Sequence, residues 1–438
     1  MPDITMLSEA ILQQSFYWAG HDLNCDAEIS IADITQLVEL VVADSIKPHP
    51  RLSYTVPVIF INTDGRQPIT SKTEYIKASI YIDGNDSYPS LGSLGNQLPI
   101  DIRGRGNATW QLFKKKPYRM KMAQSSTPLG MSPNKHFLLL AHADDSDGFL
   151  HNMTGFELSR IMGLSFTPQQ IPVELVVNNV YHGIYFLCEH IRVGVNRVNI
   201  EEQKDNEHNP ELVTGGWLLE IDNYSEDGQI LLKDANNGIM RVTPHSPEVL
   251  SDEQLAYITD FLLKTNEAIN TSDKSSTEWE RYIDIDSLAR FYIINEIMDN
   301  VEAFSGSCYM HKQRGSDTKL IFGPVWDFGR TFTRWDNPQQ HFITENLPSD
   351  CPQHWIKEIV KFPRFQQCVK QTWRNIYPNL ISDIDSFINR YIECIREAAT
   401  ADSHRWPMYN PNQTDFRKEL FLERIHNKIQ FLNNQWGQ

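Results

Sequence analysis

Two hydrophobic patterns divide the chain after its first fifty residues. Up to about residue 225, short apolar runs rich in β-branched residues alternate with turns, as in TVPVIFINT, YIKASIYIDG and LPIDIRGRG, which predicts strands. The pair Asn178-Asn179 between two apolar runs predicts a β-hairpin. After Asp252 the apolar residues recur at helical spacing, as in DEQLAYITDFLLKTNEAI. We therefore expect an α+β protein with a β-rich N-terminal lobe over about 54–225 and a mainly helical C-terminal lobe over about 226–438.

The first 48 residues carry an acidic loop followed by an amphipathic helix. Oxygen-bearing side chains fall at positions 1, 3, 5, 9 and 12 of a calcium loop: Asp22, Asn24, Asp26, Ser30 and Asp33. Glu28 would add its backbone carbonyl at position 7. The stretch resembles one repeat of a dockerin, which implies a small helical module that binds calcium and a protein partner. It departs from that family at Ala27, where the loop usually has glycine, and in showing one loop instead of two.

The alternative for this region is an Asp/Asn-rich turn before a helix. The segment SIKPHPR follows it and has the two prolines of a linker. We therefore place a module at residues 1–48 and a second domain at residues 49–438.

Charge and composition narrow the function classes. The net charge of −16 at pH 7 argues against general nucleic-acid binding and against docking on anionic membranes. No apolar run reaches the length of a membrane-spanning helix. The first residues, MPDITMLSEA, lack a leader pattern, which leaves an intracellular protein or one whose leader has been removed. The six cysteines show no zinc-binding spacing, and the common hydrolase patterns G-x-S-x-G and HExxH are absent from the sequence.

A glycine-rich basic stretch, RGRGNATW at Arg103–Trp110, precedes the lysine-rich run KKKPYRMKM. Gly104 and Gly106 would let the backbone turn sharply or approach a ligand, and the neighbouring arginines and lysines supply positive charge. These residues together suit a phosphate group, although the GK[ST] of a Walker A loop is missing. The alternative is a β-turn followed by a solvated basic strand.

The stretch Asn295–Phe332 contains the acids with the clearest chemical interpretation. A helix is followed by a polar turn, and the runs CYMHK and KLIFG predict a hairpin before the DFG at Asp327. Glu302, the hydroxyl of Ser307 five residues later, and Asp327 follow the order of the groups that accept the substrate proton and bind magnesium in protein kinases. The alternative is a core helix and hairpin with ordinary surface acids.

From about Val58 to its C-terminus the chain resembles the CotH kinases, a family named for a spore coat protein. The matching pieces occur in the family's order: RGRGNATW, KKPYRMKM, LLLAHADD with HN, VYHGIYFLCEHI, WLLEIDNY, FYIINEIMDN and GPVWDFGRTF. The resemblance implies an atypical protein-kinase-like bilobal fold. It also implies transfer of the ATP γ-phosphate to a protein serine or threonine, with magnesium or manganese. We expect a secreted or cell-surface protein, with the cytoplasm as the alternative.

The resemblance also implies roles for individual residues. Asp327 matches the metal-binding acid of the family, Glu302 stands at its catalytic aspartate, and Ser307 stands at a position that is asparagine or serine in relatives. The nucleotide-binding candidates are Arg103, then Lys116 or Lys121 as the phosphate-contacting lysine, and Glu157 or Glu189 as the acid paired with it.

Two departures from the family open a second interpretation. Glu302 is one methylene longer than the aspartate it replaces, and a misplacement of about 1 Å can cost roughly a hundredfold in rate. Asp299 is a substitute acid, at a different spacing from Ser307. The family's Arg-Asn pair is His151-Asn152 here. The alternative function is therefore that of a catalytically inactive kinase fold acting as a binding or scaffold protein.

Overall fold

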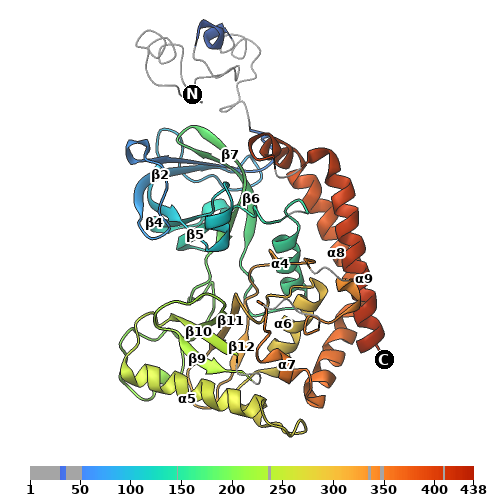
Figure 1. Ribbon diagram of the computed structural model, residues 1–438. Coiled ribbons are helices and arrows are strands. Elements are labelled where there is room, and N and C mark those ends of the chain that lie inside the picture. Colours follow the sequence, from blue (N-terminus) through green and yellow to red (C-terminus); the bar gives the residue numbers. More distant parts are fainter. Residues whose placement is uncertain are drawn as a thin grey trace. The chain divides into compact units, whose positions relative to one another are not determined.

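The computed structural model describes residues 30–35, 52–145, 147–234, 238–333, 337–345, 350–407 and 410–438 (Figure 1). They form two compact units that are interleaved along the chain. The first unit takes the described residues of Met1–Ser146, with Gln170–Glu189 and Ile392–Thr414; the second takes Asp147–Gln169, His190–Tyr391 and Asp415–Gln438. The domain limits given above, at residue 48 and near residue 225, refer to continuous segments and stay predictions.

The first unit is built on a closed barrel of strands in the order β1-β2-β3-β4-β5-β7-β6. These strands are β1 (Val58–Thr63), β2 (Ile76–Asp83), β3 (Leu98–Gly104), β4 (Tyr118–Ser126), β5 (Asn134–Leu140), β6 (Gln170–Val177) and β7 (Val180–Glu189). Neighbouring strands are antiparallel except β1 and β6, whose parallel pairing sets Val58 opposite Glu174 and closes the barrel. Every second residue points inward, so that Ile59, Ile80 and Ile102 lie in one apolar core.

The turn between β6 and β7 confirms the hairpin predicted at Asn178-Asn179. Val177 pairs with Val180 across the two-residue loop. Both asparagines have positive φ angles, 52° and 64°, as a type I′ turn requires, and asparagine tolerates this conformation better than most residues.

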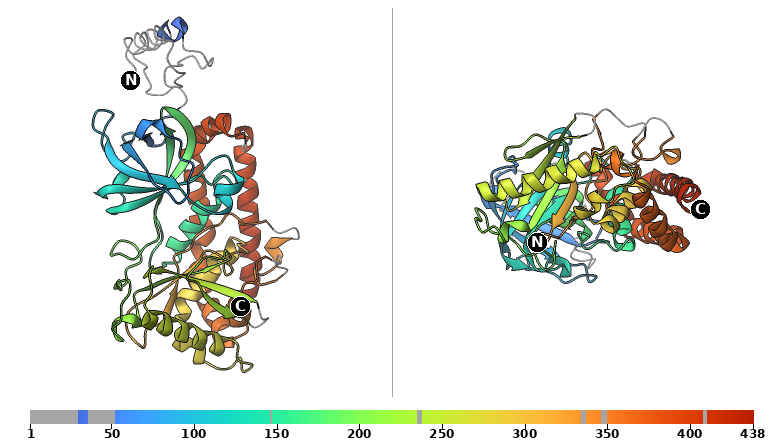
Figure 2. Two further views of the ribbon diagram at one scale, coloured as in Figure 1. Left: turned by 60° about the vertical axis from the view of Figure 1, so that its left-hand side comes forward. Right: turned by 90° about the horizontal axis from the view of Figure 1, so that it is seen from below.

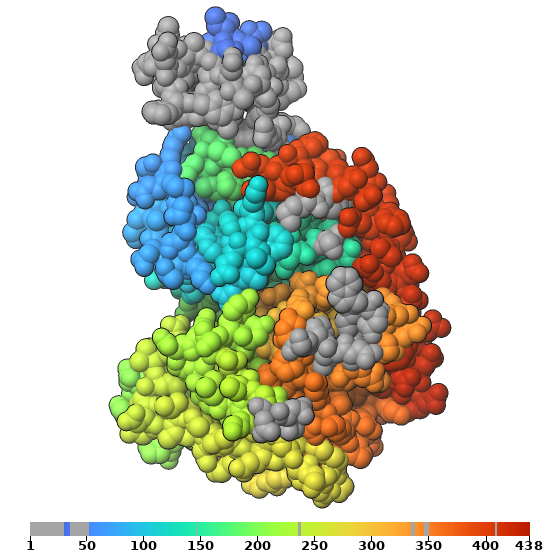
Figure 3. Space-filling model, viewed as in Figure 1, coloured from blue at the N-terminus to red at the C-terminus, as the bar shows by residue number. Residues whose placement is uncertain are grey.

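The second unit contains an antiparallel five-stranded sheet in the order β12-β11-β8-β10-β9. Its strands are β8 (Trp217–Asp222), β9 (Ile230–Lys233), β10 (Ile239–Ser246), β11 (Cys308–Lys312) and β12 (Leu320–Phe322). The pairing of β11 with β12 confirms the hairpin predicted from CYMHK and KLIFG. On one face, the Lys312 ammonium lies 5.2 Å from the ring centre of Phe261 in α5 (Asp252–Ile269). Figure 3 shows α5, in yellow, at the surface of the molecule.

The remaining helices of the structure are α3 (Ala108–Leu112), α4 (His151–Ile161), α6 (Ile285–Ile297), α7 (Ile356–Ile359), α8 (Pro363–Arg405) and α9 (Thr414–Trp436). Helix α5 confirms the helix predicted from the spacing of DEQLAYITDFLLKTNEAI. Short 3-10 turns lie at Asp64–Arg66, Pro128–Gly130, Leu212–Thr214, Glu278–Arg281, Pro338–Gln340 and Pro411–Gln413. Helix α5 begins with a capping box in which Ser251 and Gln254 satisfy each other's backbone donors, and Asp284 caps α6.

Within the second unit, α8 and α9 run side by side in opposite directions (Figure 2). The Trp373 ring near the start of α8 lies 5.3 Å from that of Trp436 at the end of α9. Further along α8, Asp385 pairs with His426 of α9 at 2.7 Å. Because α8 continues past Tyr391, its last turns belong to the first unit.

These elements confirm a mixed α+β protein with a β-rich N-terminal half and a helical C-terminal part. In the part of the chain that the structure describes, no helix combines the length and hydrophobicity needed to span a bilayer. Residues 31–35 are helical, and the Asp33 carboxylate accepts a hydrogen bond from the Ser30 backbone at 2.8 Å. The other proposed calcium ligands, Asp22, Asn24, Asp26 and Glu28, lie outside the described residues, so the calcium loop and the dockerin-like module stay predictions.

Candidate functional site

The second unit brings together the predicted acids of the stretch after α6. The helix ends at Ile297, and a tight turn carries Glu302 to Ser307, whose φ angle of 53° directs the chain into β11. Asp327 follows β12, in the loop that carries the DFG. The charge of Asp327 acts on the Glu302 carboxyl. The two acids therefore influence each other, and their role in one catalytic site stays a prediction.

The backbone at Asp327 is held by two asparagine side chains. Asp327 has a φ angle of 56°, in the left-handed region that non-glycine residues seldom adopt. The Asn300 amide donates to the Asp327 carbonyl at 3.0 Å, and the Phe328 N–H donates to the Asn152 side chain at 3.1 Å. The Asp327 carboxylate itself is exposed and accepts a hydrogen bond from the Gly329 N–H at 3.1 Å. This arrangement fixes the backbone while presenting a carboxylate to solvent.

The pKa of the Glu302 carboxyl is strongly raised. Burial raises the pKa of Glu302 to about 7, and the charge of Asp327 adds to the rise, while Arg330 and a hydrogen bond from Asn223 oppose it. The Asn223 amide donates to Oε1 of Glu302 at 2.6 Å. A carboxyl with this pKa exchanges its proton near neutral pH, which is the property of a general base.

Asn223 has the room it needs because the residue packed against it is glycine. A Cβ atom at Gly306 would lie 2.9 Å from Nδ2 of Asn223 and 3.2 Å from Oε1 of Glu302, so a larger residue would crowd the hydrogen bond. Asn223 directly follows β8, which pairs with β10 in the sheet. No sequence pattern singled it out, although it lies in the run WLLEIDNY. Its partner lies 79 residues further along the chain, so no local signal links the two.

The charges around these acids are mixed. Arg330 pairs with Asp350 at 2.6 Å, and this pair lies close enough to Glu302 to affect its titration. On β8, burial and the charge of Glu220 raise the pKa of Asp222 to about 6. Glu220 in turn pairs with His245 at 2.5 Å. Acids therefore predominate among these groups, and Arg330 is the cation that acts on Glu302.

The substitute acid, Asp299, is part of a buried cluster of charged side chains. Its carboxylate lies 3.1 Å from the Lys428 ammonium, which is also 3.2 Å from Glu296, and all three side chains are fully buried. Burial raises the pKa of Glu296, although the positive charge of Lys428 opposes the shift. Asp299 thus links the start of the turn to α9. Glu302, in the same turn, is only partly buried.

The basic candidates lie in the first unit, where each has a different environment. Lys116 donates to the Trp110 carbonyl and lies 5.4 Å from the centre of the Trp110 ring. Lys121 is exposed on β4 opposite Asp101 of β3. Arg103 lies over the Tyr75 ring at 5.0 Å. Lys116 therefore closes its own loop, whereas Lys121 projects from the barrel.

The two candidate acids also differ. Glu189 is buried at the end of β7, opposite Phe137 of β5 in the first unit. Glu157 belongs to the second unit and pairs with Arg160 one turn along α4, at 3.0 Å. The contact predicted between one of these acids and Lys116 or Lys121 stays a prediction.

A buried ion pair that the sequence analysis did not predict lies beside Lys116. The Lys115 ammonium is 2.8 Å from Oδ1 of Asp402, with both side chains 3% exposed or less. Burial lowers the pKa of Lys115 and raises that of Asp402, and each charge partly offsets the shift of the other. Asp402 also accepts the Ile184 N–H at 2.9 Å, next to Gly183, where a Cβ would lie 2.0 Å from the carboxylate.

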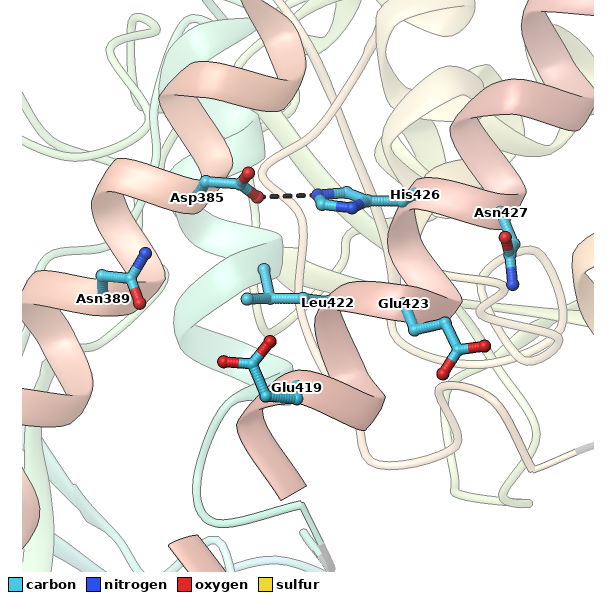
Figure 4. Close-up of a pocket in the computed structure, with 7 residues that line it drawn as sticks. All are labelled: Asp385, Asn389, Glu419, Leu422, Glu423, His426 and Asn427. Carbon is cyan, nitrogen blue, oxygen red and sulfur yellow. Dashed lines mark hydrogen bonds and ion pairs between the residues drawn. The ribbon is translucent and has the colours of Figure 1, made fainter. Parts of the chain in front are cut away.

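A polar groove lies between α8 and α9, away from the predicted site residues in the sequence. It has a volume of about 550 Å³ and is lined by Asp385, Asn389, Glu419, Leu422, Glu423, His426 and Asn427 (Figure 4). Asp385 and His426 are paired across it. Among the described residues, no group of three or more His, Cys, Asp and Glu side chains is arranged to hold a metal ion. None of the predicted site residues lines this groove.

Most of the chain matches a known protein family. The family model described as CotH kinase protein matches residues 102–432, which include the basic stretch, Glu302 and Asp327. Among curated proteins, no match to the chain was found.

Proposed function

The chain belongs to the CotH kinase family, and from this premise we propose that it transfers the γ-phosphate of ATP to a serine or threonine hydroxyl of a protein. The observation that carries the proposal is the pair of acids Glu302 and Asp327, in which the charge of Asp327 adds to the rise in the pKa of Glu302. One is exposed on a fixed backbone, and the other titrates near neutral pH. These properties suit a metal ligand and a proton acceptor in phosphoryl transfer.

Asp327 is the residue that we propose to hold the metal. Magnesium usually takes one or two carboxylates from the protein and further oxygens from phosphates and water, and manganese accepts the same ligands. The exposed Asp327 carboxylate fits this role, and a cation there would reduce the repulsion that raises the pKa of Glu302. When bound, the ion would offset the negative charge of the ATP phosphates. Ser307, at the end of the same turn, is the second candidate ligand.

Glu302 is the residue that we propose as general base. Its carboxylate would accept the proton of the attacking hydroxyl, and the hydrogen bond from Asn223 to Oε1 leaves the second oxygen for that purpose. Arg103 and either Lys116 or Lys121 are proposed as phosphate contacts, with Glu157 or Glu189 as the paired acid. A secreted or cell-surface location and calcium in the N-terminal loop stay predictions.

The test is an assay with labelled ATP, magnesium or manganese and a generic protein acceptor. Asp327→Asn should abolish metal-dependent ATP binding, because it removes the charge that holds the cation and keeps the side-chain shape. Glu302→Gln should still bind ATP, while transfer falls roughly a hundred- to ten-thousandfold. Asp317→Asn, at another exposed acid of the second unit, is the control and should behave as the wild type.

The outcome also decides about the second candidate, an inactive kinase fold with a binding or scaffold role. The presence of glutamate at position 302 favours that candidate. If ATP binds but the wild type shows no transfer, and Glu302→Asp gains it, the longer side chain is the cause of inactivity. Transfer that persists in Glu302→Gln would contradict the base assignment.

A further inference from the structure

Arg330 is the cation closest in the chain to the two acids of the site, and its backbone is held firmly. It lies three residues after Asp327, in a turn closed by the Thr331 N–H, which donates to the Phe328 carbonyl at 3.1 Å. Thr331 also forms a β-bridge with Asn300, the residue that holds the Asp327 carbonyl. The same asparagine therefore positions both the metal-binding candidate and the start of the arginine side chain.

The guanidinium of Arg330 has an exposed partner. Nη1 of Arg330 is 2.6 Å from Oδ2 of Asp350, with side-chain exposures of 34% and 65%. An ion pair this accessible to solvent contributes little stability, because water competes for both charges. The pair can therefore exchange for a stronger anionic ligand at low cost. A phosphate group is such a ligand, since the planar guanidinium fork matches its oxygens.

The position of Arg330 indicates which phosphate it would meet. Its charge acts on the Glu302 carboxyl, the proposed proton acceptor. The acceptor hydroxyl must lie within hydrogen-bond distance of that carboxyl, and the phosphate that it attacks must lie next to the hydroxyl. The terminal phosphate of ATP is therefore the one nearest to Arg330.

We propose that Arg330 binds the terminal phosphate of ATP, and that Asp350 holds the guanidinium in an alternative ion pair when no nucleotide is present. This inference rests on the proposed function and names a phosphate-binding residue for it. Asp350 acts as a competitor of the nucleotide, so the two residues have opposite effects on affinity.

The experiment measures ATP and ADP affinity by titration calorimetry at a fixed magnesium concentration. Arg330→Gln should weaken ATP binding roughly tenfold or more, because a charge-assisted contact is lost, and leave ADP binding nearly unchanged. Asp350→Asn should strengthen ATP binding roughly two- to fivefold, because the competing pair is removed. The double variant should match Arg330→Gln, since Asp350 acts only through the arginine.

A matched control exists in the same unit. Arg314 pairs with Glu201 at 2.5 Å, with side-chain exposures of 31% and 62%, close to those of the Arg330 pair. Arg314→Gln and Glu201→Gln change the same charges by the same amounts and should leave both affinities at the wild-type value. Equal losses in the two arginine variants would mean that net charge, and not a contact, is being measured, and would overturn the proposal.

Other outcomes are equally decisive. Arg330→Gln that binds ATP like the wild type, or that loses ATP and ADP equally, would overturn the terminal-phosphate assignment. Asp350→Asn without a gain in ATP affinity would overturn the competing pair, and so would absence of ATP binding in both the wild type and Asp350→Asn. The proposed function fails in a different way, when ATP binds but no acceptor is phosphorylated under any metal.

Discussion

The acidic turn of the second unit and the basic stretch of the first unit use their charged residues in opposite ways. Around Glu302 and Asp327, neutral amides hold the backbone, and the charged groups remain to interact with one another. In the basic stretch, the charged groups themselves hold the structure. Lys115 forms a buried ion pair with Asp402, and Lys116 donates to a backbone carbonyl. A cluster of charges in a sequence therefore does not show whether the charges are free for a ligand.

The difference has a physical origin. Burying an ion costs several kcal/mol unless it is paired, so a fully buried lysine must be matched by a carboxylate and cannot also serve a mobile ligand. An exposed carboxylate such as that of Asp327 loses little solvation, which suits the metal-binding role proposed for it. Burial also differs between consecutive lysines: Lys114 is exposed, Lys115 is buried and Lys116 is intermediate.

Replacing Lys115 should produce the largest change in stability. Lys115→Met keeps an unbranched side chain but leaves the Asp402 carboxylate buried without its cation. We expect the free energy of unfolding, measured by urea denaturation, to fall by about 3–5 kcal/mol. Lys114→Met, at the exposed neighbour, is the control and should change it by less than about 0.5 kcal/mol.

A second variant separates the charge from the shape. Lys115→Met combined with Asp402→Asn removes both charges and keeps an oxygen for the Ile184 N–H. It should recover most of the lost stability, because no unpaired buried charge remains. If Lys115→Met and the control Lys114→Met unfold at the same urea concentration, Lys115 is not the structural residue that its burial indicates.

Sequence patterns predicted the elements better than their combination. The two hairpins and helix α5 followed from turn residues and periodicity, because these depend on neighbours in the chain. The order of the site residues also predicts that Glu302 and Asp327 act together, and in the structure the charge of Asp327 acts on the Glu302 carboxyl. The interleaving of the two units could not be predicted, since α8 is one continuous helix whose residues divide between them at Tyr391.

The supporting side chains of the site were beyond local reasoning for the same reason. Asn223 and Glu302 are 79 residues apart, and Asn152 and Phe328 are 176 residues apart. The burial of Lys115 depends on Asp402, which lies near the end of a distant helix. Contacts of this kind depend on tertiary structure and leave no periodic signal in the chain.

A smaller effect sharpens the acidic side of the comparison, through pH. The folded-state pKa of Glu302, about 7, lies above the ordinary glutamate value of 4.5. Between these values the folded protein binds a proton that the unfolded chain does not, so this group's contribution to stability is present at low pH and is lost as pH rises towards 7. We expect the wild type to lose about 1–3 kcal/mol relative to Glu302→Gln between roughly pH 4 and pH 8.

Asn223 gives this measurement its control. The hydrogen bond from Asn223 favours the ionised form of Glu302, so Asn223→Leu should raise the pKa of Glu302 and move the loss of stability to higher pH. Asp222, whose pKa is about 6, titrates in the same range. Subtracting the Glu302→Gln curve leaves the part that belongs to Glu302. A difference curve that is flat with pH would show that Glu302 is solvated like an ordinary glutamate.

The smallest expected effect distinguishes the two lysines proposed as phosphate contacts. Lys116→Met removes the hydrogen bond to the Trp110 carbonyl and the contact with its ring, and should lower the free energy of unfolding by about 1 kcal/mol. Lys121→Met changes an exposed residue of β4 and should stay within about 0.5 kcal/mol of the wild type. Urea denaturation of both variants under one condition checks the difference. If Lys121→Met is the more destabilising, the exposed lysine has the structural role, and the contrast between the basic stretch and the acidic turn would have to rest on Lys115 alone.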